Sequence, residues 1–287
     1  MKEQVSINCI YLLGAGRSGT TLLATVMNSH KDILTLGEMN QFYEYVAENK
    51  PVSSGALILD CEYWGEVVQR LDMDVELAAK LNQISKEQEH HSKTIKWLLT
   101  KSSSKIYFEY QNSVFQSIRV SSPGKWFLDS SKYISRYLLL GQNRQIRTKG
   151  IYVVRDVRGV IHSFSKKVQT SRSPLSAILY YTAINFLGQM VCWVDRKVIK
   201  IKYEDFMDNP EMTLAKIYNH IFDNGTSHVS LPASYEMPII IGGNRMKANK
   251  SVAISKDIQW KKKMTRTQQI CYYLFAFPLM ILNGYKM

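Results

Sequence analysis

The chain has 287 residues, of which 45% are hydrophobic and 21% charged, and 37 Lys and Arg against 24 Asp and Glu give a formal net charge of +13. This composition excludes a disordered or fibrous protein, and we expect one globular domain over residues 1–287, with room for a subdomain. The positive charge favours anionic partners and leaves three classes open: nucleic acid, an anionic membrane, and a phosphorylated or sulfated small molecule.

Apolar runs typical of buried strands alternate with amphipathic segments along the chain. Strands are predicted at residues 7–14, 31–38, 124–131, 150–157 and 197–205. Helices are predicted at about residues 19–28, 132–142, 157–167 and 209–222. This order predicts an α/β fold in which a doubly wound parallel sheet is flanked by helices on both faces.

Three segments depart from this alternation. Residues 61–104 are polar and helical in pattern, which predicts a helical insertion. Residues 238–264 are rich in Gly, Asn and Lys without periodicity, which indicates a functional loop. Residues 271–285 contain Pro278 and only about a dozen apolar residues, too few to cross a bilayer, so we expect a docked helix and no transmembrane segment.

The cysteines and the start of the chain bear on its location. Cys9, Cys61, Cys192 and Cys271 lie far apart and show no CxxC or Cys/His ligand spacing, so we expect reduced structural thiols and no metal site. The first predicted strand begins at residue 7, which leaves no room for a signal peptide. We therefore expect a cytoplasmic protein.

The loop after the first strand, GAGRSGTT at residues 14–21, is close to the phosphate-binding pattern GxxxxGK[ST]. Gly14, Gly19 and Thr21 match that pattern, but Thr20 stands where the lysine belongs. A kinase without this lysine would be badly impaired, because the lysine reaches the terminal phosphates of the nucleotide. The loop carries Arg17 instead, so we expect an anion with a different layout of charge.

The segment GxGRSGTTLL resembles the 5′-phosphosulfate loop of sulfotransferases that use 3′-phosphoadenosine-5′-phosphosulfate (PAPS). The resemblance implies a P-loop-like sheet and a loop that receives a phosphate bearing a sulfuryl group, with no requirement for magnesium. It also implies which residues hold the 5′-phosphosulfate: Arg17, Ser18, Gly19, Thr20 and Thr21.

PAPS also carries a 3′-phosphate, which needs a second anion site. In VVRDVRGVIHSF, Arg155 ends a strand and Ser163 follows eight residues later, which resembles the 3′-phosphate motif of the family. Lys167, one turn beyond Ser163, would add positive charge. The alternative is that Arg155 and Asp156 form a simple charge pair at the end of the strand.

Two further residues are candidates for the chemistry. Glu38, in LTLGEMN, lies where the tyrosylprotein and carbohydrate branches carry a catalytic glutamate, which implies a general base; the steroid and phenol branch uses a histidine in another segment. Lys132, in FLDSSKY, resembles the family's DSSK segment and would stabilise the leaving nucleotide together with Arg17. The alternatives are a helix N-terminal acid for Glu38 and an exposed first-turn lysine for Lys132.

The later part of the chain extends the resemblance. Tyr203, in the segment YED, would line the nucleotide pocket or be structural together with Glu204. Residues 242–260 resemble the C-terminal region of carbohydrate sulfotransferases, although Lys247, a candidate nucleotide-binding residue, stands where arginine is more usual. The residues that fall on that pattern are Gly242, Gly243, Asn244, Lys247, Asp257 and Trp260.

The resemblance predicts a PAPS-dependent sulfotransferase without a metal. We expect a hydroxylated acceptor, a saccharide above all, bound by residues 40–120; tyrosylproteins, small molecules and lipids are alternatives. A P-loop kinase and a basic binding module are the competing classes. No RNA-binding aromatic motif is present, so nucleic acid is not an expected partner, while the basic, apolar C-terminal region suits peripheral membrane contact. The sequence leaves the oligomeric state open.

Overall fold

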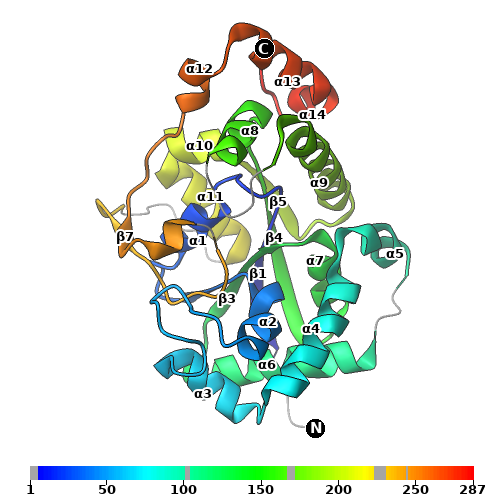
Figure 1. The fold of residues 1–287 in the computed structure, drawn as a ribbon, viewed down its shortest axis with the longest axis vertical. Helices are drawn as coiled ribbons and strands as arrows, with labels where there is room; N and C mark the ends of the chain where they lie inside the picture. Colours follow the sequence, from blue (N-terminus) through cyan, green and yellow to red (C-terminus); the bar gives the residue numbers. More distant parts are fainter. Residues whose placement is uncertain (1–5, 101–103, 167–171, 223–230, 244) are drawn as a thin grey trace.

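The computed structural model describes residues 6–100, 104–166, 172–222, 231–243 and 245–287. Its centre is a parallel sheet of five strands in the order β2-β3-β1-β4-β5 (Figure 1). The strands are β1 Ile7–Leu13, β2 Ile33–Gly37, β3 Trp126–Lys132, β4 Ile146–Val154 and β5 Val198–Lys202. The chain winds outward from β1 in both directions, so the predicted doubly wound α/β fold is confirmed.

The central strand β1 separates two hydrophobic cores. Cys9, Tyr11 and Leu13 are buried in one core, and Ile10 and Leu12 are buried in the other. This alternation follows from the two-residue repeat of a strand, and successive residues from Cys9 to Leu13 are apolar because helices cover both faces.

Each core is completed by its own set of helices, which lie on opposite sides of the sheet in Figure 1. One layer contains α1 Thr20–Met27, α10 Tyr203–Asp208 and α11 Pro210–Ile221. The other contains α6 Lys105–Ser121, α7 Ile134–Gln142, α8 Val157–Ser165 and α9 Pro174–Val194. By length and composition α9 could cross a membrane, but its buried side chains pack on α8, β4 and β5, so it belongs to the layer on the sheet.

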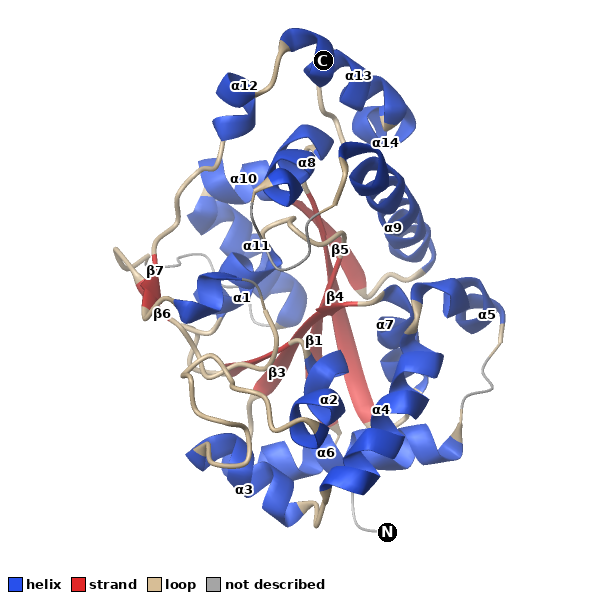
Figure 2. Ribbon diagram, in the orientation of Figure 1, coloured by secondary structure: helices blue, strands red, loops and turns tan. Residues whose placement is uncertain are grey.

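The predicted helical insertion is present and is longer than residues 61–104. It contains α3 Glu62–Arg70, α4 Val75–Glu89, the 3-10 turn η2 His91–Lys93 and α5 Thr94–Leu99. The turn η1 Met39–Gln41 and helix α2 Phe42–Ala47 precede it, and α6 continues it, with α3, α4 and α6 gathered at one end of the molecule (Figure 2).

Several predicted boundaries are wrong, among them those of the strand at residues 150–157, which is observed as β4 at Ile146–Val154. The predicted strand at residues 197–205 ends at Lys202, and Tyr203 begins α10, because Glu204 and Asp205 in the first turn favour a helix N-terminus. Lys132 is the last residue of β3 and does not begin a helix, since α7 starts at Ile134.

The last fifth of the chain returns across the carboxyl ends of the strands. Its described elements are β6 Tyr235–Glu236, η3 Arg245–Ala248, β7 Ser251–Val252, α12 Gln259–Lys263, α13 Arg266–Phe275 and α14 Phe277–Leu282. Helices α13 and α14 pack on α8 and α9 through Tyr273, Leu279 and Met280, while Phe275 and Ile281 stay exposed.

Candidate active site

A cleft of about 950 Å³ lies where the carboxyl ends of β1, β2 and β3 meet. The loop of residues 16–21 forms one wall, and Glu38 and Lys132 line the middle. Residues 40–45 and 86–91, from the helical segment, form the opposite wall. This is the edge at which open α/β sheets bind ligands.

The loop after β1 is shaped by two glycines. Gly14 has a φ of 134°, and a Cβ there would lie 2.3 Å from the carbonyl oxygen of Val153. Gly19 has a φ of 88°, and its Cβ would lie 2.5 Å from the ring of Tyr203. Both positions therefore require glycine. A turn that brings backbone N–H groups close to an anion has the same requirement.

One side chain of the loop also has an unpaired polar group that suits an anion. The hydroxyl of Ser18 is buried and has no hydrogen-bond partner among the described residues. Thr20 and Thr21 begin α1, whose first turn contains no acidic residue. A buried hydroxyl without a partner is costly, so these features fit a phosphate group held at the N-terminus of α1.

Arg17 connects the two predicted anion sites. Its φ of 70° is unusual for a residue with a side chain. Its Nε donates a hydrogen bond to Ser163 Oγ over 2.9 Å, and its carbonyl oxygen accepts a bond from Nη1 of Arg155 over 3.1 Å. The structure thus brings Arg17, Arg155 and Ser163 together, although Ser163 here bonds to Arg17.

Arg155 is almost fully buried at the end of β4. Its guanidinium stacks on the ring of Tyr203, with 4.2 Å to the ring centroid, and it packs along α8 where Gly159 leaves room. The alternative pairing with Asp156 is not observed, because Asp156 binds Arg158 over 2.6 Å and caps α8. Asp257, from the C-terminal part of the chain, forms an ion pair with Arg155 over 3.5 Å.

Glu38 and Lys132 form an ion pair in the middle of the cleft, and each side chain is 16% exposed. Gln41 Nε2 donates a second hydrogen bond to Glu38 over 2.7 Å. Lys132 has a φ of 69°, a strained conformation for a non-glycine residue, and strain of this kind is concentrated at functional sites. Neither residue is a freely solvated surface charge.

A buried polar network holds the end of β3 in place. Asp129 accepts a bond from Arg136 Nε over 2.8 Å and another from the backbone N–H of Ser131 over 2.9 Å. Arg136 also pairs with Glu89, whose pKa is raised by burial although the charge of Arg136 opposes this. Both carboxylate oxygens of Asp129 are therefore used inside the protein.

The returning C-terminal chain covers Glu38. The backbone N–H of Glu38 donates to the carbonyl oxygen of Ile241 over 2.8 Å, and Gly242 passes so close that a Cβ would lie 2.7 Å from Glu38 Cβ. Lys247 lines the same cleft and donates to Tyr45 Oη over 3.0 Å. Two other residues singled out in the sequence, Lys167 and Asn244, lie outside the described residues.

Several residues of the cleft carried no signal in the sequence. His91 stacks on Tyr133, with ring centroids 4.6 Å apart, and burial lowers the pKa of His91 to about 4. Tyr180 accepts a hydrogen bond from the backbone N–H of Gly16 over 2.9 Å. Lys166, next to Lys167 in sequence, donates to Asp257 over 3.1 Å. These contacts join residues from different elements, which no local motif reveals.

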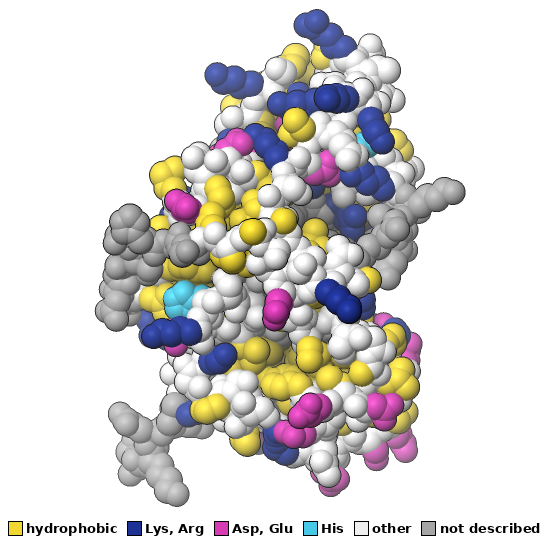
Figure 3. Space-filling view, turned by 90° about the vertical axis from the view of Figure 1, so that its left-hand side faces the viewer, with side chains coloured by type: hydrophobic (Ala, Val, Ile, Leu, Met, Phe, Trp, Pro, Cys, Tyr) yellow, Lys and Arg dark blue, Asp and Glu magenta, His cyan; other side chains and the backbone are white. Residues whose placement is uncertain are grey.

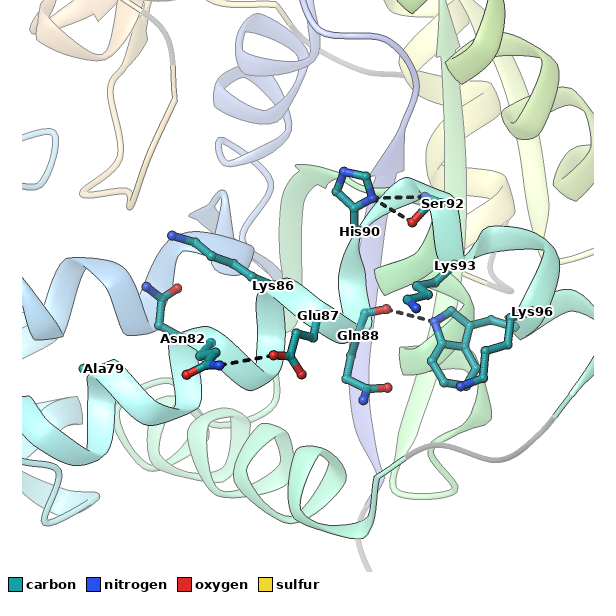
Figure 4. A pocket seen from close by; sticks show the side chains of 11 residues that line it. Ala79, Asn82, Lys86, Glu87, Gln88, His90, Ser92, Lys93 and Lys96 are labelled. Carbon is teal, nitrogen blue, oxygen red and sulfur yellow. Dashed lines mark hydrogen bonds between the residues drawn. The ribbon is translucent and has the colours of Figure 1, made fainter.

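A second cavity, of about 750 Å³, adjoins the cleft and shares Lys86 and His90 with it. Figure 4 shows its side chains along α4 and the start of α5, among them Lys93 and Lys96. The two cavities adjoin at the shared residues Lys86 and His90 and follow the helical segment away from Glu38.

Comparison with known proteins agrees with this geometry. Residues 9–222 match the model of a family described as "Sulfotransferase family". The comparison with curated protein sequences gave no match.

The solved structures that share the fold include two sulfotransferase domains. The "Sulfotransferase Domain from the Curacin Biosynthetic Pathway" has 16% identity and a TM-score of 0.54, covering 98% of this chain and 99% of its own. The "Sulfotransferase Domain from the Synechococcus PCC 7002 Olefin Synthase" has 15% identity and a TM-score of 0.52, covering 100% and 98%. Since the family model matches well over half of the sequence, the chain belongs to the sulfotransferase family.

Proposed function

We propose that the protein transfers the sulfuryl group of PAPS to a hydroxyl group of a carbohydrate acceptor. The observation that carries this proposal is the joining of two anion sites, the loop at Arg17 and the buried Arg155, through a 3.1 Å hydrogen bond beside the Glu38–Lys132 pair. PAPS is a nucleotide with anionic groups at both its 5′ and 3′ positions, so it needs two such sites.

The residues of the loop suit the 5′-phosphosulfate. The unpaired Ser18 hydroxyl, the start of α1 at Thr20 and the charge of Arg17 would bind its oxygens. Arg155 would bind the 3′-phosphate with a guanidinium already fixed by Tyr203, and Lys166 and Lys247 add positive charge near the two ends of the nucleotide. Bound PAPS would supply an activated sulfuryl group with a good leaving group.

Glu38 is the proton acceptor in this proposal. The acceptor oxygen forms a bond to sulfur while the bond from sulfur to the phosphate oxygen breaks, and the hydroxyl proton passes to Glu38. Lys132 and Arg17 stabilise the negative charge that builds up on the departing phosphate. Gln41 keeps the Glu38 carboxylate oriented when Lys132 turns toward that phosphate.

The shape of the cleft supports an extended polar acceptor. A cleft of about 950 Å³ that continues into a groove of about 750 Å³ could take several sugar units. The walls combine aromatic rings such as Tyr45 and Tyr133 with charged side chains such as Lys86. Lys93 and Lys96, farther along the groove, suit an acceptor that itself carries negative charge.

The division of roles can be tested with two variants. We expect Glu38→Gln to lower turnover by at least ~100-fold and to leave binding of 3′-phosphoadenosine-5′-phosphate (PAP) nearly unchanged, because only the proton acceptor is lost. We expect Arg155→Ala to weaken PAP binding by about 10- to 100-fold. Turnover is measured as PAP release from PAPS with a panel of desulfated polysaccharides, and binding by calorimetry. Equal loss of PAP binding in both variants would refute this assignment.

A further inference from the structure

The chain's own Asp257 lies on the guanidinium of Arg155. Nη2 of Arg155 is 3.5 Å from Asp257 Oδ2, and it donates a hydrogen bond to the Asp257 carbonyl oxygen over 3.2 Å. Lys166 Nζ donates to the same carboxylate oxygen over 3.1 Å. One acid therefore receives contacts from two cations, of which Arg155 is the residue that we assign to the 3′-phosphate.

The two partners differ in how firmly they are held. Arg155 has a side-chain exposure of 7% and is fixed by the Tyr203 ring and the Arg17 carbonyl oxygen, whereas the Asp257 side chain is 28% exposed. Partial burial raises the pKa of Asp257, but the bond from Lys166 and the charge of Arg155 lower it below the ordinary value, so the group is a carboxylate at neutral pH. The acid can therefore leave while the arginine stays.

A carboxylate and a phosphate compete for the same donors. Both accept paired hydrogen bonds from a guanidinium, and a phosphate brings more negative charge. The two anions cannot share Arg155 at close range without strong repulsion. On the basis of the proposed function, we propose that the Asp257 carboxylate is an internal stand-in for the 3′-phosphate. Nucleotide binding expels this carboxylate from Arg155. The competition between the two anions thereby sets the affinity of the protein for 3′-phosphorylated nucleotides.

The segment around Asp257 is built to move between two fixed points. Val252 in β7 and Trp260 in α12 are buried, and Arg158 stacks on Trp260 at 4.4 Å. The residues between them run along the side of the molecule from β7 to α12 (Figure 1). Lys256, in the same segment, forms an ion pair with Asp208, and this pair lies at the surface of the protein. Ile254 packs against one of the two cores, so expulsion of Asp257 would shift residues 255–259 and leave that core unchanged.

Calorimetry with PAP and AMP tests this proposal on the wild-type protein and on Asp257→Asn. We expect the variant to bind PAP about tenfold more tightly, because a charged competitor is removed, and to bind AMP as the wild type does, because AMP has no 3′-phosphate. Asp208→Asn is the matched control, since it removes an exposed acid that contacts the residue next to Asp257, and we expect it to bind PAP as the wild type does.

The outcomes separate this proposal from the one on which it rests. If the wild type binds PAP and Asp257→Asn binds it equally or more weakly, the stand-in is overturned and the sulfotransferase proposal is untouched. If neither protein binds PAP, the proposed nucleotide is wrong, and the proposed role of Asp257 is refuted as well. Hydrogen exchange on the wild type gives a readout that needs no variant: exchange in residues 255–259 should change with PAP but not with AMP, and no change would overturn the stand-in.

Discussion

Glu38 and Lys132 come from different strands, and their pairing depends on strand order. Glu38 follows β2, Lys132 ends β3, and the two strands are neighbours in the sheet. The sequence motifs predicted both residues as site candidates, and the structure brings them into one ion pair. Their pairing could not be predicted, because no local pattern states that β3 lies between β1 and β2.

The same limit applies to the anion sites. Arg17 and Arg155 could be recognised from short motifs around each residue. The bond from Arg17 to Ser163 and the contact of Asp257 with Arg155 join residues far apart in the sequence. Such contacts follow from the packing of α8 and of the C-terminal chain, which periodicity does not encode.

His91 gives the cleft wall a pH-dependent stability. Burial lowers its pKa from 6.5 to about 4, so the folded protein keeps the ring neutral while the unfolded chain takes up a proton below pH 6.5. The stability that the neutral ring contributes is present above pH 6.5 and is lost as the pH falls toward 4. We expect the urea midpoint of the wild type to fall more steeply between pH 7 and pH 5 than that of His91→Gln.

The exposed neighbour His90 provides the control. His90→Gln removes an adjacent exposed imidazole whose charge adds a smaller part to the lowering of the His91 pKa, so we expect it to reduce the pH slope less than His91→Gln does. Parallel slopes for the wild type and His91→Gln would contradict the assignment of this pH dependence to His91.

At the scale of elements, the strands were easier to predict than the segments that cross them. The apolar alternation predicted the five strands, since each must fill two cores. The sequence predicts that the strand at β5 continues to residue 205, because Tyr203 continues the apolar pattern of that strand. In the structure, Tyr203 starts α10 and packs against Gly19. Tertiary packing and the acidic first turn outweighed strand propensity there.

The loop of residues 238–243 is the element that closes the site over Glu38. Gly242 has a φ of 66°, and a Cβ there would meet Glu38 at 2.7 Å; Gly284 has a φ of 68°, with nothing within 4 Å. We expect Gly242→Ala and Gly284→Ala each to cost about 1 kcal/mol of stability from backbone strain. Only Gly242→Ala should lower turnover, because only there does the added methyl group displace Glu38.

Turnover and urea midpoints of both glycine variants check this expectation. A similar decrease of turnover in both would mean that backbone strain alone is responsible. Unchanged turnover in Gly242→Ala would show that the loop does not position Glu38.

At the scale of the whole molecule, the net charge of +13 is unevenly distributed. In Figure 3, Lys and Arg side chains gather at the end that carries α12 and α13, where Lys261, Lys262, Lys263 and Arg266 are exposed. Acidic side chains are more frequent at the opposite end, around α3 and α4. The basic end includes the α8 and α12 region next to Arg155, so the overall field favours the approach of an anionic nucleotide.

The fold and the match to the family follow from features that run along the whole chain. The acceptor does not, because the wall that would bind it comes from residues 40–45 and 86–91. In the sequence, residues 61–104 show only a polar, helical pattern, and residues 40–45 lie outside it. The side chains of that wall became visible only when they were placed around the cleft.

The central claim is that the protein binds a nucleotide through two separate phosphate groups without a metal. Calorimetric titration with PAP in the absence of magnesium tests it most directly, with AMP and magnesium-ATP as controls. The account predicts micromolar binding of PAP, at least about tenfold tighter than AMP, because Arg155 adds a charge-assisted contact to the 3′-phosphate. Absence of PAP binding, or a preference for magnesium-ATP, would contradict it.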